Sequence, residues 1–398
     1  ILKDLGNLKE AESLTRKAIE LKPDFADAHY NLGIILKDLN KLQKAEISYQ
    51  KAIELNPNFA KAHCNLGSIL KDMGKLQEAE ISLRKAIELN PNLFKSHFSL
   101  GNILYRQKKL KEAENSYRKA IKLHPKCAEA HCNLGTTIKD LGQLQEAELS
   151  LRKAIKLNPD YADAYFNLSF IELLKDDYKN GLENYEFRFK KKSSASLHGN
   201  PIISKLDSRE LHKGEKLLVV TEQGLGDTLQ YMRYVPYLRS QGIDVSFSAQ
   251  EKLHTLIKAS GIDPNPLTPT QTNAVSEGKW IPLLSLPRYL QISPNNPIIT
   301  EPYIHSTDEL NKKWKNILSR EKRPLIGINW QGNKSFEKKD MRGRSLPLET
   351  FSSLAKNNNY NFLSLQKGFG SEQLNNCSFK NKFVDCQSEI DNTWDFLE

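Results

Sequence analysis

Residues 222–229, Glu-Gln-Gly-Leu-Gly-Asp-Thr-Leu, are the stretch of this sequence best suited to do chemistry. An apolar run at 216–221 precedes them and predicts a buried strand, and the amphipathic run at 228–241 predicts a helix. In doubly wound α/β folds, ligands bind at the carboxyl ends of strands, beside helix N-termini with unpaired N–H groups. Asp227 could therefore take a proton from a hydroxyl group. The alternative is that Asp227 caps the helix that begins at Thr228.

Two glycines in this turn, Gly224 and Gly226, are expected to let the backbone turn sharply and leave room for a ligand beside Gln223. A dinucleotide fingerprint is disfavoured, because Leu229 occupies the place of its third glycine and Asp227 would repel a pyrophosphate. The next predicted strand, 245–248, ends at Ala249 and Gln250 without an acidic residue for a ribose, and a helix is expected over 250–259.

A second α/β unit is predicted from Pro324. The apolar strand 325–330 ends in the polar loop Gln331-Gly332-Asn333, a helix follows at 348–356, and the strand 361–365 ends in Gln366-Lys367-Gly368. Trp330 is expected in the core. Since such a lobe needs more strands and the sequence opens at Ile1 without Met, we expect truncation at both ends.

The first half of the chain repeats with a period of 34 residues. Prolines, Leu-Gly pairs and Ala-Glu pairs all recur at this interval, which matches the tetratricopeptide pattern of paired helices. The prolines are Pro23, Pro57, Pro91, Pro125 and Pro159. Small residues such as Gly33 and Ala45 are predicted where two helices cross closely, and Pro57 where the second helix ends. A degraded fifth repeat is expected from Ala162, with Ser169 in place of the glycine.

Two polar residue types recur with the repeats. His29, His63, His97 and His131 are predicted to pack between helices, because residues one repeat apart lie roughly 10 Å apart and cannot share a metal. The asparagines lie on the first helix of each pair, where they could hold an extended peptide or bond to the neighbouring repeat; both interpretations stay open. They are Asn31, Asn65, Asn133 and Asn167.

Composition narrows the class of protein. The 398 residues suggest two or three domains, and a net charge of +10 could attract nucleic acid, but the basic residues are spread through the repeats without interleaved aromatics. No nucleic-acid partner is therefore expected. Five cysteines without a paired C-x-x-C motif favour reduced thiols in a cytoplasmic protein without a zinc site. No apolar run is long enough to predict a membrane span.

The 34-residue repeats occur together with five segments that carry a resemblance: EQGLGDTLQYMRYVPYL (222–238), IPLLSLP (281–287), INWQGN (328–333), RSLPLETF (344–351) and SLQKG (364–368). Together they resemble bacterial repeat-containing glycosyltransferases, which are similar to the heptosyltransferases and more distantly to the O-linked N-acetylglucosamine transferases. The resemblance implies an α-solenoid at 1–189, a linker at 190–213, a first Rossmann-like GT-B lobe at 214–310 for the acceptor, and a partial second lobe at 311–398 for the donor.

The same resemblance implies an inverting transfer from a nucleotide-sugar to an acceptor hydroxyl, with Asp227 as base and Gln223, Gly224 and Gly226 in the acceptor loop. The implied donor contacts are Asn333, Arg344, Ser345, Gln366 and Lys367. Since no carboxylate cluster suited to a divalent metal is evident in the sequence, the transfer is expected to need no metal and no cofactor beyond its sugar donor. The repeats are expected to present the acceptor, which is either a polypeptide in the repeat groove or another molecule. The alternative function is a non-catalytic repeat scaffold for protein interaction with an inactive α/β lobe.

Overall fold

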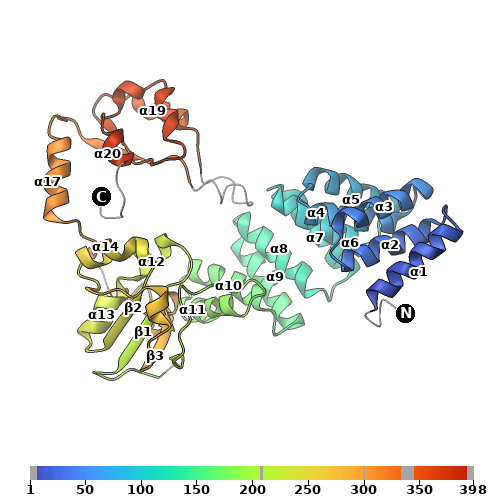
Figure 1. Ribbon diagram of the computed structural model, residues 1–398, viewed down its shortest axis with the longest axis horizontal. Coiled ribbons are helices and arrows are strands. Elements are labelled where there is room, and N and C mark those ends of the chain that lie inside the picture. Colours follow the sequence, from blue (N-terminus) through green and yellow to red (C-terminus); the bar gives the residue numbers. More distant parts are fainter. Residues whose placement is uncertain (1–6, 207–208, 299–300, 333–344, 392–398) are drawn as a thin grey trace. The chain divides into compact units, whose positions relative to one another are not determined.

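The computed structural model describes residues 7–206, 209–298, 301–332 and 345–391. The chain divides into two compact units, Ile1–Ser194 and Ala195–Glu398, and the division falls inside the segment 190–213 that the sequence predicts as a linker. Each unit has its own arrangement of elements (Figure 1).

The first unit consists of helices that pack in antiparallel pairs, one pair for each 34-residue repeat. Consecutive helices lie side by side in Figure 1, from α1 to α11. They are α1 (Leu8–Leu21), α2 (Ala26–Asp38), α3 (Leu42–Leu55), α4 (Ala60–Asp72), α5 (Leu76–Leu89), α6 (Phe94–Arg106), α7 (Leu110–Leu123), α8 (Ala128–Asp140), α9 (Leu144–Leu157), α10 (Ala162–Leu174) and α11 (Tyr178–Tyr185). The predicted tetratricopeptide solenoid is therefore confirmed for this unit.

Two sequence features set the helix boundaries. In each pair, the turn after the first helix contains one residue with positive φ, and this left-handed residue ends the helix. These residues recur every 34 positions, from Asn40 to Asp176. The recurring proline follows the second helix, as at Pro57, which lies two residues after Leu55. Small residues lie at the helix crossings: a Cβ on Gly33 would lie 2.6 Å from Cε1 of Tyr49, so only glycine fits there. One buried core runs through all the repeats as a result.

Ion pairs link successive repeats on the surface. In four of the five repeats, the acidic residue after the recurring alanine accepts a lysine from the next repeat, as in Lys41–Glu12 at 2.8 Å and Lys175–Glu148 at 2.7 Å. Glu114 instead pairs within its own helix. The hydrogen bonds from Lys41 and Arg16 lower the pKa of Glu12, and the bond from Lys175 lowers the pKa of Glu148 against an opposing effect of burial.

We expect the thermal midpoint of the repeats to fall as the pH drops below about 4.3, the ordinary value for glutamate. A lowered pKa in the folded state means that the stabilisation is present above the unfolded pKa and is lost as protons bind, by about 0.5 kcal/mol for each such pair. Circular dichroism melts from neutral pH to about pH 3 measure it. Glu148→Gln should reduce the acid sensitivity, whereas Glu54→Gln, which affects an exposed pair within one helix, should change it less. Equal sensitivity of both variants would contradict the assignment.

The second unit contains two small parallel sheets in its described residues. In the first, β1 (Lys216–Val220) lies between β2 (Asp244–Ser248) and β3 (Lys279–Pro282), and both neighbours run parallel to it. The helices along this part are α12 (Leu225–Tyr231), α13 (Tyr234–Ser240), α14 (His254–Ala259), α15 (Pro269–Thr272), α16 (Leu286–Tyr289) and α17 (Asp308–Ile317). In the second sheet, β4 (Leu325–Ile328) pairs with β5 (Asn361–Ser364). Parallel α/β structure is thus present, while a complete GT-B lobe stays a prediction.

Three predicted helices are shorter or broken in the structure. The helix expected over 228–241 begins earlier, at Leu225, and divides into α12 and α13, because Pro236 has no N–H to donate to the carbonyl of Met232. The helix expected over 250–259 is a 3₁₀ turn followed by α14, and the one over 348–356 is a 3₁₀ turn followed by α19 (Ser352–Ala355). The chain ends its described part with α20 (Gln387–Asp391).

Candidate functional site

The recurring asparagines lie on the face of the solenoid formed by α2, α4, α6, α8 and α10, which we call the groove. Asn65 donates from Nδ2 to the hydroxyls of Tyr30 at 3.2 Å and Tyr49 at 3.4 Å. Asn133 donates to Oδ1 of Asn102 at 2.9 Å, and Asn167 donates to Oγ1 of Thr136 at 3.0 Å. Asn31 is exposed. Bonding to the neighbouring repeat, one of the two open interpretations, is therefore present.

The amide oxygens of these asparagines differ from their amide nitrogens in hydrogen bonding. In the part of the chain that the structure describes, no side chain or backbone group donates to Oδ1 of Asn65 or Asn133. A bound peptide could therefore still donate its N–H groups to these oxygens. The asparagines can thus bond to the neighbouring repeat and hold an extended peptide at the same time.

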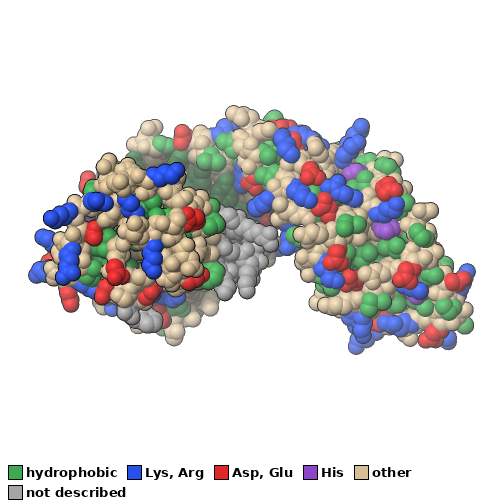
Figure 2. All heavy atoms as spheres, turned by 90° about the horizontal axis from the view of Figure 1, so that it is seen from above, with side chains coloured by type: hydrophobic (Ala, Val, Ile, Leu, Met, Phe, Trp, Pro, Cys, Tyr) green, Lys and Arg blue, Asp and Glu red, His purple; other side chains and the backbone are tan. Residues whose placement is uncertain are grey.

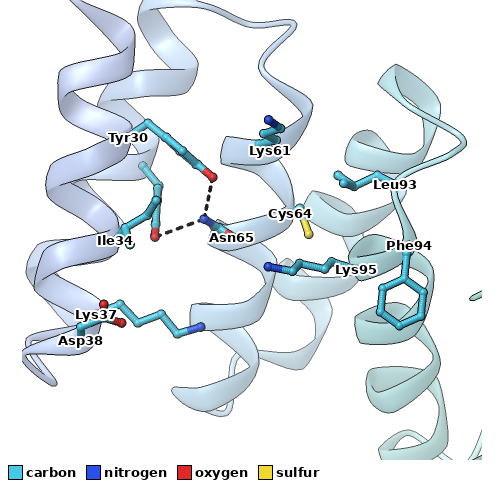
Figure 3. A pocket seen from close by; sticks show the side chains of 11 residues that line it. Tyr30, Ile34, Lys37, Asp38, Lys61, Cys64, Asn65, Leu93, Phe94 and Lys95 are labelled. Carbon is cyan, nitrogen blue, oxygen red and sulfur yellow. Dashed lines mark hydrogen bonds between the residues drawn. The ribbon is translucent and has the colours of Figure 1, made fainter. Parts of the chain in front are cut away.

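A pocket of about 590 Å³ opens in the groove around Asn65 (Figure 3). Its lining includes Lys37, Lys61 and Lys95, with Asp38 as the one acidic member. Figure 3 shows the side chains of Lys37 and Lys95 directed into the space beside Asn65. Within the described ranges, neither Lys61 nor Lys95 forms an ion pair, and Lys37 donates to Oγ of Ser68 at 3.3 Å. The pocket therefore presents an excess of positive charge.

A second pocket, of about 540 Å³, opens further along the groove around Asn133. Two basic and two acidic side chains line it, and they are already engaged: Lys71 pairs with Asp72 at 3.2 Å, Asp163 lies 3.6 Å from Lys191, and Arg106 donates to the carbonyl of Lys71. Tyrosines form much of the remaining wall. This pocket is aromatic and carries no excess charge.

Tyrosines are the groove residues that the sequence reasoning missed. Tyr49 and Tyr117 are almost completely buried, and their hydroxyls reach the floor of the two pockets. Burial raises the pKa of both phenols, so they remain protonated donors at neutral pH. The signal that could have found them is their spacing of 68 residues, which equals two repeats.

The four recurring histidines have a local structural role. Each Nε2 lies within hydrogen-bond distance of the carbonyl of the proline six residues earlier, at 2.8 Å for His97 and 3.2 Å for His63. The imidazole thus holds the turn that precedes its own helix, a hydrogen bond that the predicted packing between helices did not include. Among the described residues, no group of three or more His, Cys, Asp or Glu side chains could hold a metal, and all five cysteines are free thiols.

In the α/β unit, Asp227 caps α12. Asp227 is the third residue of the helix, and its Oδ2 accepts the backbone N–H of Gly224, the residue that precedes the helix, at 3.0 Å. The capping alternative is corrected in its position: the helix begins at Leu225 rather than Thr228, so Asp227 lies in the first turn and bonds back to the N-cap residue. The carboxylate is only half buried and remains accessible.

The glycines of this loop do not make its sharp turn. The residue in the left-handed region is Gln223, with φ 62°, whereas Gly224 has φ −87° and a Cβ on Gly226 would meet nothing within 4 Å. The prediction that the two glycines turn the chain is wrong in this respect. Gly226 lies in the first turn of α12 and leaves open space where a side chain would be, so a ligand has room to approach the helix there.

Two side chains that the sequence did not single out hold this loop. Glu222 is fully buried and accepts the backbone N–H of Leu284, just beyond β3. Thr228 donates to Oε1 of Gln250 at 2.8 Å, which ties the start of α12 to the end of β2. Both contacts join loops at the carboxyl edge of the sheet. A cavity of about 340 Å³ in this unit lies at the opposite edge, beside Lys216 and Asp244.

The predicted donor-side residues are only partly described. Gln366 is buried and fully engaged: its Oε1 accepts the N–H groups of Trp330 and Gln331, and its Nε2 donates to the carbonyl of Phe369. Ser345 accepts the N–H of Gly332 at 2.8 Å. Gln366 and Ser345 therefore hold loops together, and Trp330 is core as predicted.

The remaining predicted donor contacts are Lys367, Asn333 and Arg344. Lys367 is exposed. Asn333 and Arg344 lie outside the described residues. Of the five predicted donor contacts, the structure describes Ser345, Gln366 and Lys367, and it brings Gln366 together with Gln331.

Two further features concern membrane spans and the distribution of surface charge. No described helix is both long and apolar enough to cross a lipid bilayer. On the face shown in Figure 2, basic and acidic side chains are interspersed rather than gathered into a patch of one sign.

The repeats of the first unit match known families. The tetratricopeptide repeat family matches residues 1–25, 26–59, 60–93 and 82–115, and the TPR repeat family matches 101–139 and 137–171. No curated protein matches the chain.

Among solved structures, the chain is similar to YrrB, described as a TPR protein with an unusual peptide-binding site, at 25% identity over 44% of this chain and 89% of YrrB, with a TM-score of 0.39. It is similar to MamA from Desulfovibrio magneticus RS-1 at 23% identity over 42% of this chain and 97% of MamA, with a TM-score of 0.39. TTC0263, a thermophilic TPR protein from Thermus thermophilus, matches at 21% identity over 43% of this chain and 94% of that protein, with a TM-score of 0.36. The family matches together show that residues 1–171 of this chain are tetratricopeptide repeats.

Proposed function

We propose that this protein is a repeat scaffold for protein interaction and that its groove binds an extended stretch of polypeptide. The observation that carries the proposal is the pair of pockets in the groove, each with an asparagine whose amide oxygen faces no donor in the described chain. Repeat solenoids use such extended surfaces for binding. An extended peptide presents N–H groups at regular intervals and would find acceptors along this face.

The test is peptide binding by asparagine variants. Peptides would be selected from a random library on the purified chain, and their affinities would be measured for the wild type and for Asn31, Asn65 and Asn133 changed together to alanine. Loss of these hydrogen bonds should weaken binding by about tenfold or more. Asn115→Ala, on an exposed position of α7, is the matched control. Unchanged affinity in the triple variant would remove the groove from the proposal.

A second proposal concerns the α/β unit: transfer of a sugar from a nucleotide-sugar to an acceptor hydroxyl, with Asp227 as the base. It is supported by the parallel order β2-β1-β3 and by the open space beside Gly226, in the first turn of α12. Inversion needs a base on the hydroxyl while the sugar passes through a transition state like an oxocarbenium ion. The half-buried carboxylate of Asp227 has the exposure that such a base requires.

The capping bond makes Asp227→Asn a sharp test. Asparagine keeps an acceptor oxygen, Oδ1, for the N–H of Gly224, so this variant should keep a stability close to that of the wild type but lose the base. Asp227→Ala should lose both the base and this hydrogen bond, which costs about 1 kcal/mol of stability. Turnover of a panel of nucleotide-sugars by the whole chain measures the first effect, and urea unfolding measures the second. A fully active Asp227→Asn protein would exclude this carboxylate as the base.

A further inference from the structure

The two pockets of the groove are lined by equivalent positions of repeats that lie two repeats apart. Most residues that line the first have a counterpart 68 residues later in the second. The pairs are Ile34 and Asn102, Lys37 and Tyr105, Asp38 and Arg106, Tyr49 and Tyr117, Cys64 and Cys132, Asn65 and Asn133, Leu93 and Tyr161, and Lys95 and Asp163. The groove therefore has a period of two repeats at these pockets, whereas the fold has a period of one.

The residues beneath the glycines explain this doubled period. Gly33 and Gly101 lie against Tyr49 and Tyr117, while the intervening Gly67 and Gly135 lie against Leu83 and Leu151. A tyrosine carries a hydroxyl to the groove floor and a leucine does not. Hydrogen bonds then form around that hydroxyl, from Asn65 to Tyr49 in one pocket and from Tyr117 to Asn102 in the other.

The charges of the two pockets differ although their frames match. Lys95 in the first pocket is replaced by Asp163 in the second, Asp38 by Arg106, and Lys37 by Tyr105. Three lysines against one aspartate leave the first pocket basic, whereas two basic and two acidic residues leave the second neutral. An acidic side chain would thus be attracted to the first pocket and would meet Asp163 in the second.

We infer that one extended polypeptide occupies both pockets, with an acidic side chain in the first and an uncharged side chain, such as tyrosine, in the second. This inference rests on the proposed function of the groove and adds the chemistry and spacing of its ligand. The aromatic wall of Tyr105, Tyr117 and Tyr161 suits an uncharged aromatic side chain by stacking and by contact with its hydroxyl.

The spacing of the two anchors follows from the pitch of the repeats. Packed helices lie about 8–10 Å apart, so two repeats advance the groove by roughly 20 Å. An extended chain rises about 3.3 Å per residue, and the two anchors should therefore be about six residues apart. A peptide with closer anchors can fill only one pocket at a time and loses the gain of double attachment.

The experiment uses synthetic peptides with blocked ends on the intact chain. The reference probe carries a glutamate and, about six residues away, a tyrosine in a Gly-Ser background, and it is made in both orders because peptide direction is not assumed. Three further probes shorten the spacing by half, replace the glutamate by lysine, or replace the tyrosine by a second glutamate. Each change is expected to weaken binding by about tenfold, measured by fluorescence anisotropy at low salt.

Variants of the protein test the charge assignment. Lys95→Asp places in the first pocket the residue that the second carries, and should reduce affinity for the reference probe by about tenfold or more and favour the lysine probe. Asp163→Lys should make the second pocket accept the probe with two glutamates. Lys119→Asp changes the net charge equally at an exposed position of α7 and is the control. Circular dichroism checks that all three variants fold.

The outcomes separate this inference from the proposed function. Equal affinity for the glutamate and lysine probes, insensitivity to spacing, or an identical effect of Lys95→Asp and Lys119→Asp would overturn it. If library peptides still depend on Asn65 and Asn133 in that case, the groove binds polypeptide and only the two-anchor ligand is wrong. If no peptide binds in a manner that depends on these asparagines, both fail.

Discussion

Replacing Tyr117 by alanine is expected to lower the free energy of unfolding of the repeats by about 3–5 kcal/mol, as for other large aromatic residues removed from a core. The ring is 1% exposed, packs against the backbone of Gly101, and contacts Phe98 at a centroid distance of 6.1 Å. Its hydroxyl donates to Asn102 at 2.7 Å. Alanine would leave a cavity and remove this bond, and neighbouring repeats could not fill the space because their own side chains are fixed at the next crossing.

Two milder variants divide this effect into its parts. Tyr117→Phe keeps the ring and loses only the hydroxyl bond, so we expect about 1 kcal/mol. Tyr117→Leu introduces the residue that the chain itself uses at Leu83 and Leu151, and should fall between the other two. Urea unfolding followed by far-ultraviolet circular dichroism reports on these helices. A Tyr117→Phe protein as unstable as Tyr117→Ala would show that packing of the ring is not what stabilises this crossing.

Replacing Gly278 by alanine is expected to destabilise the three-stranded sheet by about 3 kcal/mol or more, through steric overlap added to backbone strain. Gly278 lies directly before β3 with φ 91°, and a Cβ there would lie 2.4 Å from the carbonyl oxygen of Lys216. Because that oxygen belongs to the first residue of β1, the overlap can be relieved only by moving the two paired strands apart.

Gly214→Ala is the matched control, since Gly214 also has a left-handed φ, 85°, but a Cβ there would meet nothing within 4 Å. It should show the backbone strain alone, about 1–2 kcal/mol. All four tryptophans of the sequence lie beyond residue 279, so their fluorescence reports on the second unit and not on the repeats. Similar losses for Gly278→Ala and Gly214→Ala would mean that the contact with Lys216 contributes nothing.

The repeat period made the first unit predictable in detail. Pro57, Gly33 and Ala45 recur at fixed offsets, and each has one physical reason for its place: an end of a helix, or a crossing too close for a larger side chain. In the α/β unit, four of the described strands were predictable, because short apolar runs identify strands but not helix breaks. The strand β3 was not predicted. The break before Pro236 and the short helix after Leu348 depend on single residues and on contacts with other segments.

In the candidate sites too, the sequence identified residues, but their partners depend on contacts with other segments. Asp227 was recognised by its place after a strand, but whether its carboxylate caps α12 depends on the orientation of one backbone N–H, that of Gly224. Gln366 was assigned to the sugar donor by the family resemblance, and in the structure its amide holds the loops after β4 and β5. A polar side chain at the end of a strand can bond either to a ligand or to neighbouring loops, and the sequence does not predict which partner it has.

By itself, the sequence determined the helical pairs, the asparagines of the groove and four of the described strands, because the periods of helix and strand place side chains on defined faces. Only the tertiary structure decided which of those side chains meet: Asn65 with Tyr30 and Tyr49, and Asn133 with Asn102. These partners lie 16 to 35 residues apart in sequence. Their contact depends on how closely neighbouring helices cross, and that distance is set by the packing of small and large residues between them.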